Sequence, residues 1–334
     1  MERYSLLDLS PIVAGQTATD ALANTLALSQ HAEKLGYYRY WLAEHHNMIG
    51  IASAATSVVI GRVASVTKTI RVGAGGVMLP NHSPLIVAEH YGTLGTLFPD
   101  RIDLGLGRAA GADAATTRAL RRAMQNEDTF PQDVVELIEY FEPADENTSV
   151  RAVPGEGTKI PIYILGSSLY GAQLAAYLGL PYAFASHFAP AMLEQAAAIY
   201  RSTFKPSKRL SKPYFMMTVN VGAADTDEEA KFNWSSVLQA FAKMVTGERG
   251  KLPLPTENVS ALFPPHVLRH AEQMLSCSAV GSCESISGQL KALIDLYKPD
   301  EVIVAANAHS HLARMRSFEM ASTVLGGFCG DQRP

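Results

Sequence analysis

Residues 70–106, IRVGAGGVMLPNHSPLIVAEHYGTLGTLFPDRIDLGL, contain one complete strand–helix–strand unit. Residues 70–78 are a short apolar run with several glycines, which predicts a strand. Ser83 followed by Pro84 is typical of a helix start, with a serine N-cap and proline at the first helical position. Residues 102–106 then predict the next strand. Two strands joined through a helix form a right-handed crossover in a parallel sheet, so this stretch predicts an α/β protein.

The same alternation runs along the whole chain. Strands are predicted over residues 5–9, 38–42, 70–78, 102–106, 162–165, 182–185, 214–221 and 302–305. Helices are predicted over residues 18–35, 53–66, 83–97, 116–141 with a break at Pro131, 169–178, 192–204, 227–245, 266–275, 284–297 and 312–325. Eight strands with helices between them are typical of the (β/α)8 barrel, or TIM barrel.

An open, doubly wound sheet is the structural alternative, because alternation alone does not show that a sheet closes. The number of units favours the barrel. We expect one barrel domain over residues 1–334, with insertions of which the longest lies between the seventh and eighth strands.

The charge balance argues against a nucleic-acid partner. The 334 residues include 28 Lys and Arg against 32 Asp and Glu, and no basic block occurs. A charged fraction of 18% lies below the usual ~25%, which indicates that part of the surface is hidden in an oligomer. The apolar helix that begins near Ser53 is the expected face of a homodimer.

Cysteine usage and the lack of targeting signals predict a cytoplasmic protein. The chain has three cysteines, Cys277, Cys283 and Cys329, whose spacing fits neither a disulfide framework nor a zinc site. The N-terminal residues lack the pattern of a signal peptide. Residues 160–193 carry no charge, but prolines and glycines interrupt them, so no membrane span is expected.

The second predicted strand ends in residues with acid–base chemistry. In a TIM barrel the catalytic residues lie at the carboxyl ends of the strands, and here that position holds Glu44, His45 and His46. His45 is a candidate general acid or base near neutral pH, with Glu44 or a backbone carbonyl holding its tautomer. Consecutive residues that leave a strand point to opposite sides, so His45 and His46 are not expected to bind one ion, and no metal site is predicted.

Glycines mark the ends of the third and fourth strands. Gly75 and Gly76 weaken a strand, so they indicate either close approach of a flat ligand to the backbone or a plain bulge. Residues 105–110 match the dinucleotide fingerprint G-x-G-x-x-G/A, but no strand with a terminal acid follows, which argues against that function. Arg108 is instead a candidate phosphate ligand at the barrel mouth.

The fifth predicted strand leads into a turn suited to an anion. Gly166, Ser167 and Ser168 precede a helix whose first turn holds Gly171. Such a turn brings together free N–H groups, hydroxyls and the positive end of the helix dipole. No lysine follows in the pattern of an NTPase P-loop.

Taken together, these motifs make the chain resemble the bacterial-luciferase-like flavin monooxygenase family, in particular its non-luminescent, single-chain bacterial members. The resemblance is strongest in residues 40–46 (YWLAEHH), 72–80 and 101–108 (RIDLGLGR). It continues through residues 162–168 and through residues 179–181 (GLP).

The resemblance implies a (β/α)8 barrel that binds FMN, uses it in reduced form with O₂ and oxygenates a small organic molecule. His45 matches the family's catalytic histidine, and Gly75-Gly76 match the site of a non-prolyl cis peptide beneath the flavin ring. The expected cofactor-binding residues are Gly75, Gly76, Arg108, Gly166, Ser167, Ser168 and Gly171, of which Arg108, Ser167 and Ser168 match phosphate-binding positions. Further candidates for the flavin or substrate pocket are Asp8, Glu44, His46, Ser186 and His187.

The chain also departs from the family pattern. The reactive cysteine of luciferase is Gly107 here, which argues against light emission and a long-chain aldehyde substrate. A second phosphate arginine has no clear counterpart, and Arg118 and Arg121 are the candidates to replace it. Residues 247–265 resemble the family's mobile segment over the active site, with a plain exposed loop as the alternative.

Nothing in the chain resembles a nicotinamide-binding domain, so reduced FMN is expected from a separate NAD(P)H:flavin reductase in a two-component system. Three alternatives stay open at this point. They are hydride transfer with a deazaflavin of the F420 type, a flavin-binding protein without turnover, and a barrel of unrelated chemistry that binds a sugar phosphate. No residue identifies the organic substrate.

Overall fold

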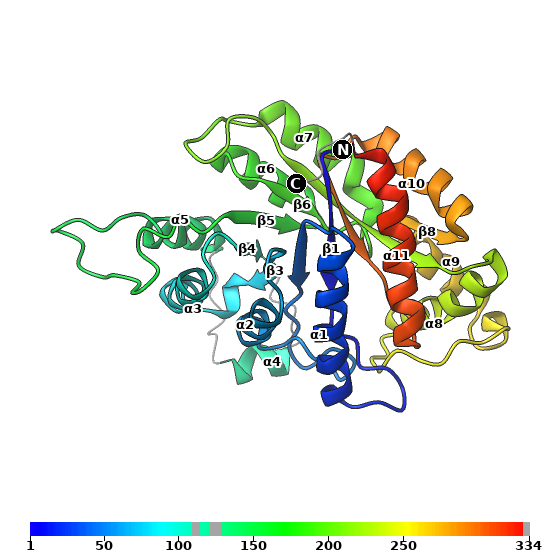
Figure 1. The fold of residues 1–334 in the computed structure, drawn as a ribbon. Coiled ribbons are helices and arrows are strands. Elements are labelled where there is room, and N and C mark those ends of the chain that lie inside the picture. The colour runs from blue at the N-terminus through cyan, green and yellow to red at the C-terminus, as the bar shows by residue number, and fades with distance from the viewer. Residues whose placement is uncertain (109–113, 121–127, 330–334) are drawn as a thin grey trace.

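The computed structural model describes residues 1–108, 114–120 and 128–329, and these residues form a β-barrel wrapped by helices (Figure 1). Each predicted strand is present within two residues of its expected bounds. The strands are β1 (Arg3–Asp8), β2 (Arg39–Leu42), β3 (Arg71–Met78), β4 (Ile102–Gly107), β5 (Ile162–Gly166), β6 (Tyr182–Phe184), β7 (Phe215–Ala223), β8 (Ser278–Gly281) and β9 (Glu301–Ala305).

The strands close into a ring. Neighbours pair in the order β6-β5-β4-β3-β2-β1-β9-β7, and β6 also pairs with β7, so eight parallel strands form a closed barrel. β8 lies beside the carboxyl-terminal half of β7, where Asn220 pairs with Ser278. The predicted (β/α)8 barrel is therefore confirmed, and the open doubly wound sheet is excluded. β8 was not predicted, because SAVG is too short to show a period.

Helices connect the strands and cover the outside of the ring, with α1 and α11 side by side (Figure 1). They are α1 (Ala18–Lys34), α2 (Thr56–Val66), α3 (Pro84–Leu97), α4 (Ala114–Ala119), α5 (Phe130–Tyr140), α6 (Leu169–Leu178), α7 (Leu193–Thr203), α8 (Asp227–Val245), α9 (Pro265–Met274), α10 (Cys283–Tyr297) and α11 (His311–Phe328). Short 3-10 turns occur at Leu79–Asn81, Pro190–Met192 and Val259–Ala261. The longest connection runs from β7 to β9, as predicted.

The helical stretch predicted over residues 116–141, with a break at Pro131, is two helices, α4 and α5. Pro131 lies in the first turn of α5 rather than between the helices, and residues 121–127 lie outside the described part of the chain. Among the described residues, none of the helices combines the length and the apolar character that a bilayer crossing requires.

Local sequence explains where several helices begin and end. Thr17 and Asp20 form a capping box at the start of α1, each side chain accepting the other's backbone N–H. Pro84 occupies the start of α3, as the sequence predicted. Gly179 ends α6 with a φ of 64°, in the left-handed region that glycine adopts without steric cost.

Alternate residues of each strand face the barrel interior or the surrounding helices. Leu7, Trp41 and Tyr163 pack together inside the barrel. Their sequence neighbours Leu6 and Tyr40 belong to the larger core between strands and helices. Because both faces of the strands are buried, the strands read as nearly continuous apolar runs in the sequence.

Charged side chains fill the amino-terminal end of the barrel interior. Arg39 of β2 lies between Asp103 of β4 and Glu301 of β9, with N–O distances of 2.8 Å to each carboxylate. The Tyr163 hydroxyl accepts a hydrogen bond from Arg39 at 2.7 Å, and the Tyr214 hydroxyl donates one to Glu301 at 2.7 Å. These groups close the amino-terminal end of the barrel, and the candidate site residues lie at the opposite end.

Candidate active site

The carboxyl ends of β2 to β6 bring most of the predicted residues to one rim. Leu42 of β2 pairs with Ala74 of β3, and Gly107 of β4 pairs with Leu165 of β5. Phe184 of β6 pairs with Gly166 of β5. The predicted site residues follow these paired positions, with His45 after β2 and His187 after β6. They therefore lie at the same end of the barrel.

Near its carboxyl end, β3 presents backbone without side chains at Gly75 and Gly76. The peptide bond between Gly75 and Gly76 is cis, as the resemblance implied. A Cβ on Gly75 would lie 2.9 Å from the ring of Trp41, and a Cβ on Gly76 would lie 2.8 Å from the carbonyl oxygen of Gly105. The register between β3 and β4 also shifts at this point. The register shift agrees with the bulge interpretation of these glycines, and close approach of a flat ligand to the backbone stays a prediction.

His45, after β2, and His187, after β6, are close enough for the charge of one to affect the other. The Nδ1 atom of each ring is buried and has no hydrogen-bond partner among the described residues. Burial lowers the pKa of His45, an effect that the charge of Glu44 opposes and that of His46 reinforces. Burial, with a smaller contribution from His45, lowers the pKa of His187 to about 3. Both imidazoles are therefore neutral at pH 7.

Glu44 does not orient His45, which excludes one of the two possibilities that the sequence left open. Its Oε1 atom lies 2.6 Å from Nε2 of His46 and 2.7 Å from Nε2 of His82. Glu44 and His46 are two residues apart at the end of an extended segment and share a side, whereas His45 points away. His82 was not among the predicted site residues. The signal that could have found it is its place just after β3, at the same rim.

Arg108 follows β4 and lies over the first turn of α6. Its guanidinium carbon is 4.0 Å from the centre of the Tyr170 ring. Its Nε atom pairs with Asp128 at 3.1 Å, and the Tyr170 hydroxyl donates to the same carboxylate at 2.8 Å. Such an exposed ion pair is weak, so an anionic ligand can replace Asp128. Arg118 is exposed on α4, and Arg121 lies outside the described residues.

The turn between β5 and α6 leaves the amino end of the helix open. Ser168 is the N-cap residue, but its side chain makes no capping hydrogen bond. A Cβ on Gly171 would lie 3.5 Å from Cα of Gly166 and 3.2 Å from the ring of Tyr182, so the turn and the helix pack closely. The first N–H groups of α6 therefore receive no capping bond from Ser168, and anion binding at this turn stays a prediction.

Two of the predicted pocket residues are engaged elsewhere. Asp8 points away from the barrel interior, and its carboxylate accepts hydrogen bonds from Arg314 at 2.6 Å and Thr25 at 2.7 Å. Asp8 follows Leu7, which faces the interior, so alternation directs Asp8 toward α1 and α11. Ser186 is fully buried and donates to the backbone carbonyl of Thr218 at 2.6 Å. Neither side chain is left free for a ligand.

Three connections meet above the rim. Pro11, after β1, forms an antiparallel bridge with Ile51, after β2, and Val13 forms a parallel bridge with Leu252. The backbone of Leu252 donates one hydrogen bond at 3.2 Å and accepts another at 2.8 Å. Leu252 therefore ties the segment 247–265 to the β1–α1 connection, while most residues of the segment are exposed.

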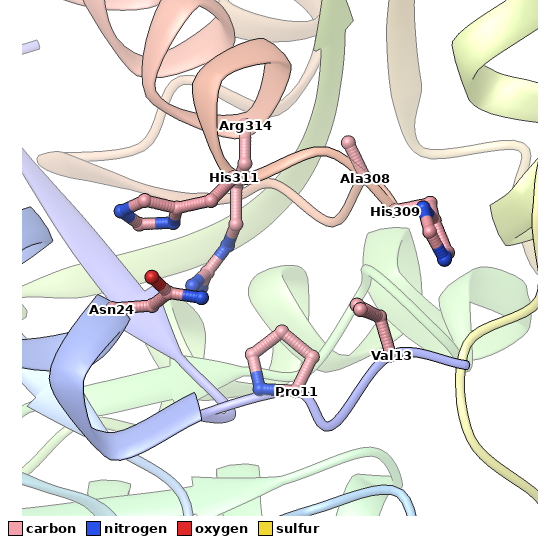
Figure 2. Close-up of a pocket in the computed structure, with 7 residues that line it drawn as sticks. All are labelled: Pro11, Val13, Asn24, Ala308, His309, His311 and Arg314. Atoms are coloured by element: carbon pink, nitrogen blue, oxygen red, sulfur yellow. The ribbon is translucent and has the colours of Figure 1, made fainter. Parts of the chain in front are cut away.

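A small cavity separates the β1–α1 connection from the β9–α11 connection, with His311 and Arg314 on one side and Pro11 on the other (Figure 2). Its volume is about 10 Å³, which is room for about one water molecule. His309 spans the two connections, because its Nε2 atom lies 3.0 Å from the carbonyl oxygen of Ala14. The cavity is too small for a substrate.

Comparison with known proteins gives consistent matches. Residues 3–296 match the family model described as luciferase-like monooxygenase. The chain is 54% identical over 322 residues to a luciferase-like monooxygenase of Escherichia coli strain K12, covering 96% of each protein. It is 32% identical over 338 residues to the N-acetyl-S-alkylcysteine monooxygenase of Bacillus subtilis strain 168, covering 97% of this chain and 98% of the relative.

Solved structures share the fold. The crystal structure of apo-MsnO8 has a TM-score of 0.90 at 32% identity and covers 98% of this chain and 99% of that one. The oxygenating constituent of 3,6-diketocamphane monooxygenase from Pseudomonas putida, solved with FMN, has a TM-score of 0.71 at 18% identity, with 98% of each chain covered. An F420-dependent secondary alcohol dehydrogenase with an F420–acetone adduct has a TM-score of 0.69 at 14% identity, with 97% and 99% covered. The last two matches show a common fold alone.

Proposed function

Because this chain belongs to the luciferase-like monooxygenase family, we propose that it is a monooxygenase that uses reduced FMN and O₂ to oxygenate a small organic molecule. The observation that carries the proposal is the pairing of two features on adjacent strands. One is the backbone of Gly75-Gly76 at the end of β3, and the other is the neutral imidazole of His45 after β2, whose Nδ1 has no partner among the described residues.

The residues at the rim fit FMN. Gly75 and Gly76 would hold the flat ring system, since no side chain stands between it and the backbone. Arg108 and the open amino end of α6, with Ser167 and Ser168, would hold the phosphate. Close packing of Gly166 against Gly171 would keep this turn in place.

Reduced FMN, when bound, would supply the electrons that activate O₂. His45 would accept a proton at its free ring nitrogen and return it, because a neutral imidazole with a lowered pKa acts as a base at pH 7. His187 would face the same space as a neutral hydrogen-bonding group. The bridged connections at Pro11, Ile51 and Leu252 would restrict the access of water.

The partners follow from the same proposal. A separate NAD(P)H:flavin reductase in the cytoplasm would provide reduced FMN. A homodimer would cover α2 and α3, where Val58 is 71% exposed and Leu97 is 64% exposed. Light scattering that finds only monomer would contradict the dimer.

A deazaflavin-dependent hydride transfer is the second candidate. The observation that favours it is the shared fold with an F420-dependent dehydrogenase. A flavin-binding protein without turnover is the remaining alternative. Fluorescence titration with FMN and with F420 separates the cofactors, and we expect tighter binding of FMN.

The decisive experiment measures oxygen insertion. The full chain is incubated with FMN, a flavin reductase, NADH and ¹⁸O₂, together with S-alkylcysteine derivatives and cyclic ketones, which the names of the relatives suggest. We expect substrate-dependent oxygen uptake and one labelled oxygen atom in the product. Tight FMN binding with no labelled product over the whole panel would support a binding protein without turnover and reject the monooxygenase.

A further inference from the structure

A second group of side chains lies at the same rim of the barrel, beside the proposed FMN site, and the proposed reaction does not use it. Glu44 is 3% exposed, and one of its oxygens, Oε1, contacts Nε2 of both His46 and His82. The potential donor atoms of these three residues all lie within 4.8 Å of one another. Two of the residues follow β2 and the third follows β3. Because β2 and β3 are paired neighbours, their carboxyl ends bring the three residues together.

A pocket of about 400 Å³ opens against this group. Its walls are largely apolar and come from the segment before α2, from α2 itself, from β3 and from α3. They include Ala55, Val58, Val77 and Val87.

Tyr91 of α3 also lines the pocket and is an independent sign of a ligand. The residue is 2% exposed, and none of the described residues forms a hydrogen bond with its hydroxyl. Burial, with a contribution from the Glu44 charge, raises the pKa of Tyr91 well above its ordinary value, so the hydroxyl keeps its proton. A buried donor without a partner costs stability unless a bound group accepts its hydrogen bond.

We propose that Glu44, His46 and His82 bind a divalent cation of the zinc type, with an open coordination position that faces this pocket. Two imidazoles and one carboxylate form a donor set typical of zinc sites that retain a position for water or another ligand. Mg²⁺ and Ca²⁺ prefer oxygen ligands, so the two histidines select against them. The Tyr91 hydroxyl would donate to the ligand in the open position.

Binding requires only a small rearrangement. The present N–O distances are 2.6 and 2.7 Å, whereas donors about 2.0–2.1 Å from a tetrahedral ion lie about 3.3 Å apart. Each imidazole must therefore move by less than about 1 Å. In the hydrogen-bonded form both Nε2 atoms donate to the carboxylate, so each Nε2 must give up its proton before it can bind the metal.

The test is a metal titration of the full chain. Protein stripped with EDTA and desalted is titrated with Zn²⁺ against a chromophoric chelator, and with Co²⁺ by visible absorption. We expect one ion per chain and a Co²⁺ spectrum of low coordination number. His46→Ala and His82→Ala should each weaken Zn²⁺ binding by more than about 100-fold, which exceeds the usual effect of losing an outer partner of a ligand.

Two further variants keep the test decisive. His90→Ala is the matched control, because His90 lines the same pocket but is not one of the three converging residues. Its Zn²⁺ affinity should equal that of the wild type. His82→Cys keeps a metal ligand and should add a thiolate-to-Co²⁺ charge-transfer band, even if the alanine variants fail to fold.

Two results would overturn the proposal. One is a wild type that takes up no stoichiometric Zn²⁺, which would make Glu44, His46 and His82 a hydrogen-bonded cluster only. The other is a His82→Cys protein that binds Co²⁺ without the thiolate band, which would place the ion elsewhere.

Discussion

Arg39 and Glu301 form an ion pair with two hydrogen bonds inside the barrel. Nε of Arg39 donates to Oε1 of Glu301 at 2.8 Å, and Nη2 donates to Oε2 at 3.0 Å. Both side chains are buried, with exposures of 2% and 0%. This two-point geometry joins β2 to β9 at the end of the barrel opposite the rim of the candidate active site.

Glu301→Gln should lower the free energy of unfolding by about 3 kcal/mol, because it leaves the buried Arg39 guanidinium with one carboxylate fewer. Urea unfolding measures the change. The control is Asp295→Asn, which removes an exposed pair with Lys291 and should leave stability almost unchanged. Equal effects in the two variants would show that the buried pair has no special role.

His45→Ala should retain FMN binding and lose oxygenation, because His45 is proposed to move a proton rather than to hold the cofactor. FMN fluorescence quenching measures the first property, and incorporation of ¹⁸O measures the second. The control is His266→Ala on the exposed surface of α9, which should change neither. Product formation by His45→Ala at the wild-type rate would remove the catalytic role.

Arg108→Gln should weaken FMN binding by about 10–100-fold through loss of a charged hydrogen-bond donor to the phosphate. Riboflavin, which lacks the phosphate, should bind the wild type and Arg108→Gln with equal affinity. Asp128→Asn should strengthen FMN binding, because the Asp128 carboxylate forms an ion pair with the Arg108 guanidinium and competes with the phosphate. A parallel loss of FMN and riboflavin affinity in Arg108→Gln would argue for a role in folding instead.

The partly buried His187 should make the protein less stable in mild acid. Its pKa is about 3 in the folded state and near 6.5 in the unfolded chain, so below pH 6.5 the unfolded state alone takes up the proton. The wild type should therefore lose about 1 kcal/mol more than His187→Asn between pH 7 and pH 5.5. Urea unfolding at the two pH values tests this, and parallel losses would refute it.

Gly76→Ala should lower the free energy of unfolding by about 1–3 kcal/mol, because its Cβ would meet the carbonyl of Gly105 at 2.8 Å and the strand must shift. Gly288→Ala in α10 is the control, since nothing lies within 4 Å of its Cβ and alanine favours a helix. The two substitutions should act in opposite directions. Thermal unfolding that ranks them the other way would mean that β3 tolerates a side chain there.

The alternation of strands and helices could be predicted along almost the whole chain. Each element buries one or two faces, so the spacing of its apolar residues indicates whether it is a strand or a helix. The ends of helices also depend on residues next to them in the sequence, such as Thr17 at the start of α1 and Gly179 at the end of α6. The Gly75-Gly76 cis peptide was expected from the family resemblance, and the structure contains it.

The sequence by itself therefore determined the order of elements, the rim that holds most of the candidate site residues and the separation of His45 from His46, because side-chain alternation is a local property. Only the tertiary structure decided that the ring closes through β6 and β7 and that His82 joins Glu44. It also decided that Asp8 pairs with Arg314, 306 residues away. The reason is that backbone geometry sets the direction of a side chain, whereas its partner depends on which distant segments the closed barrel brings to the same place.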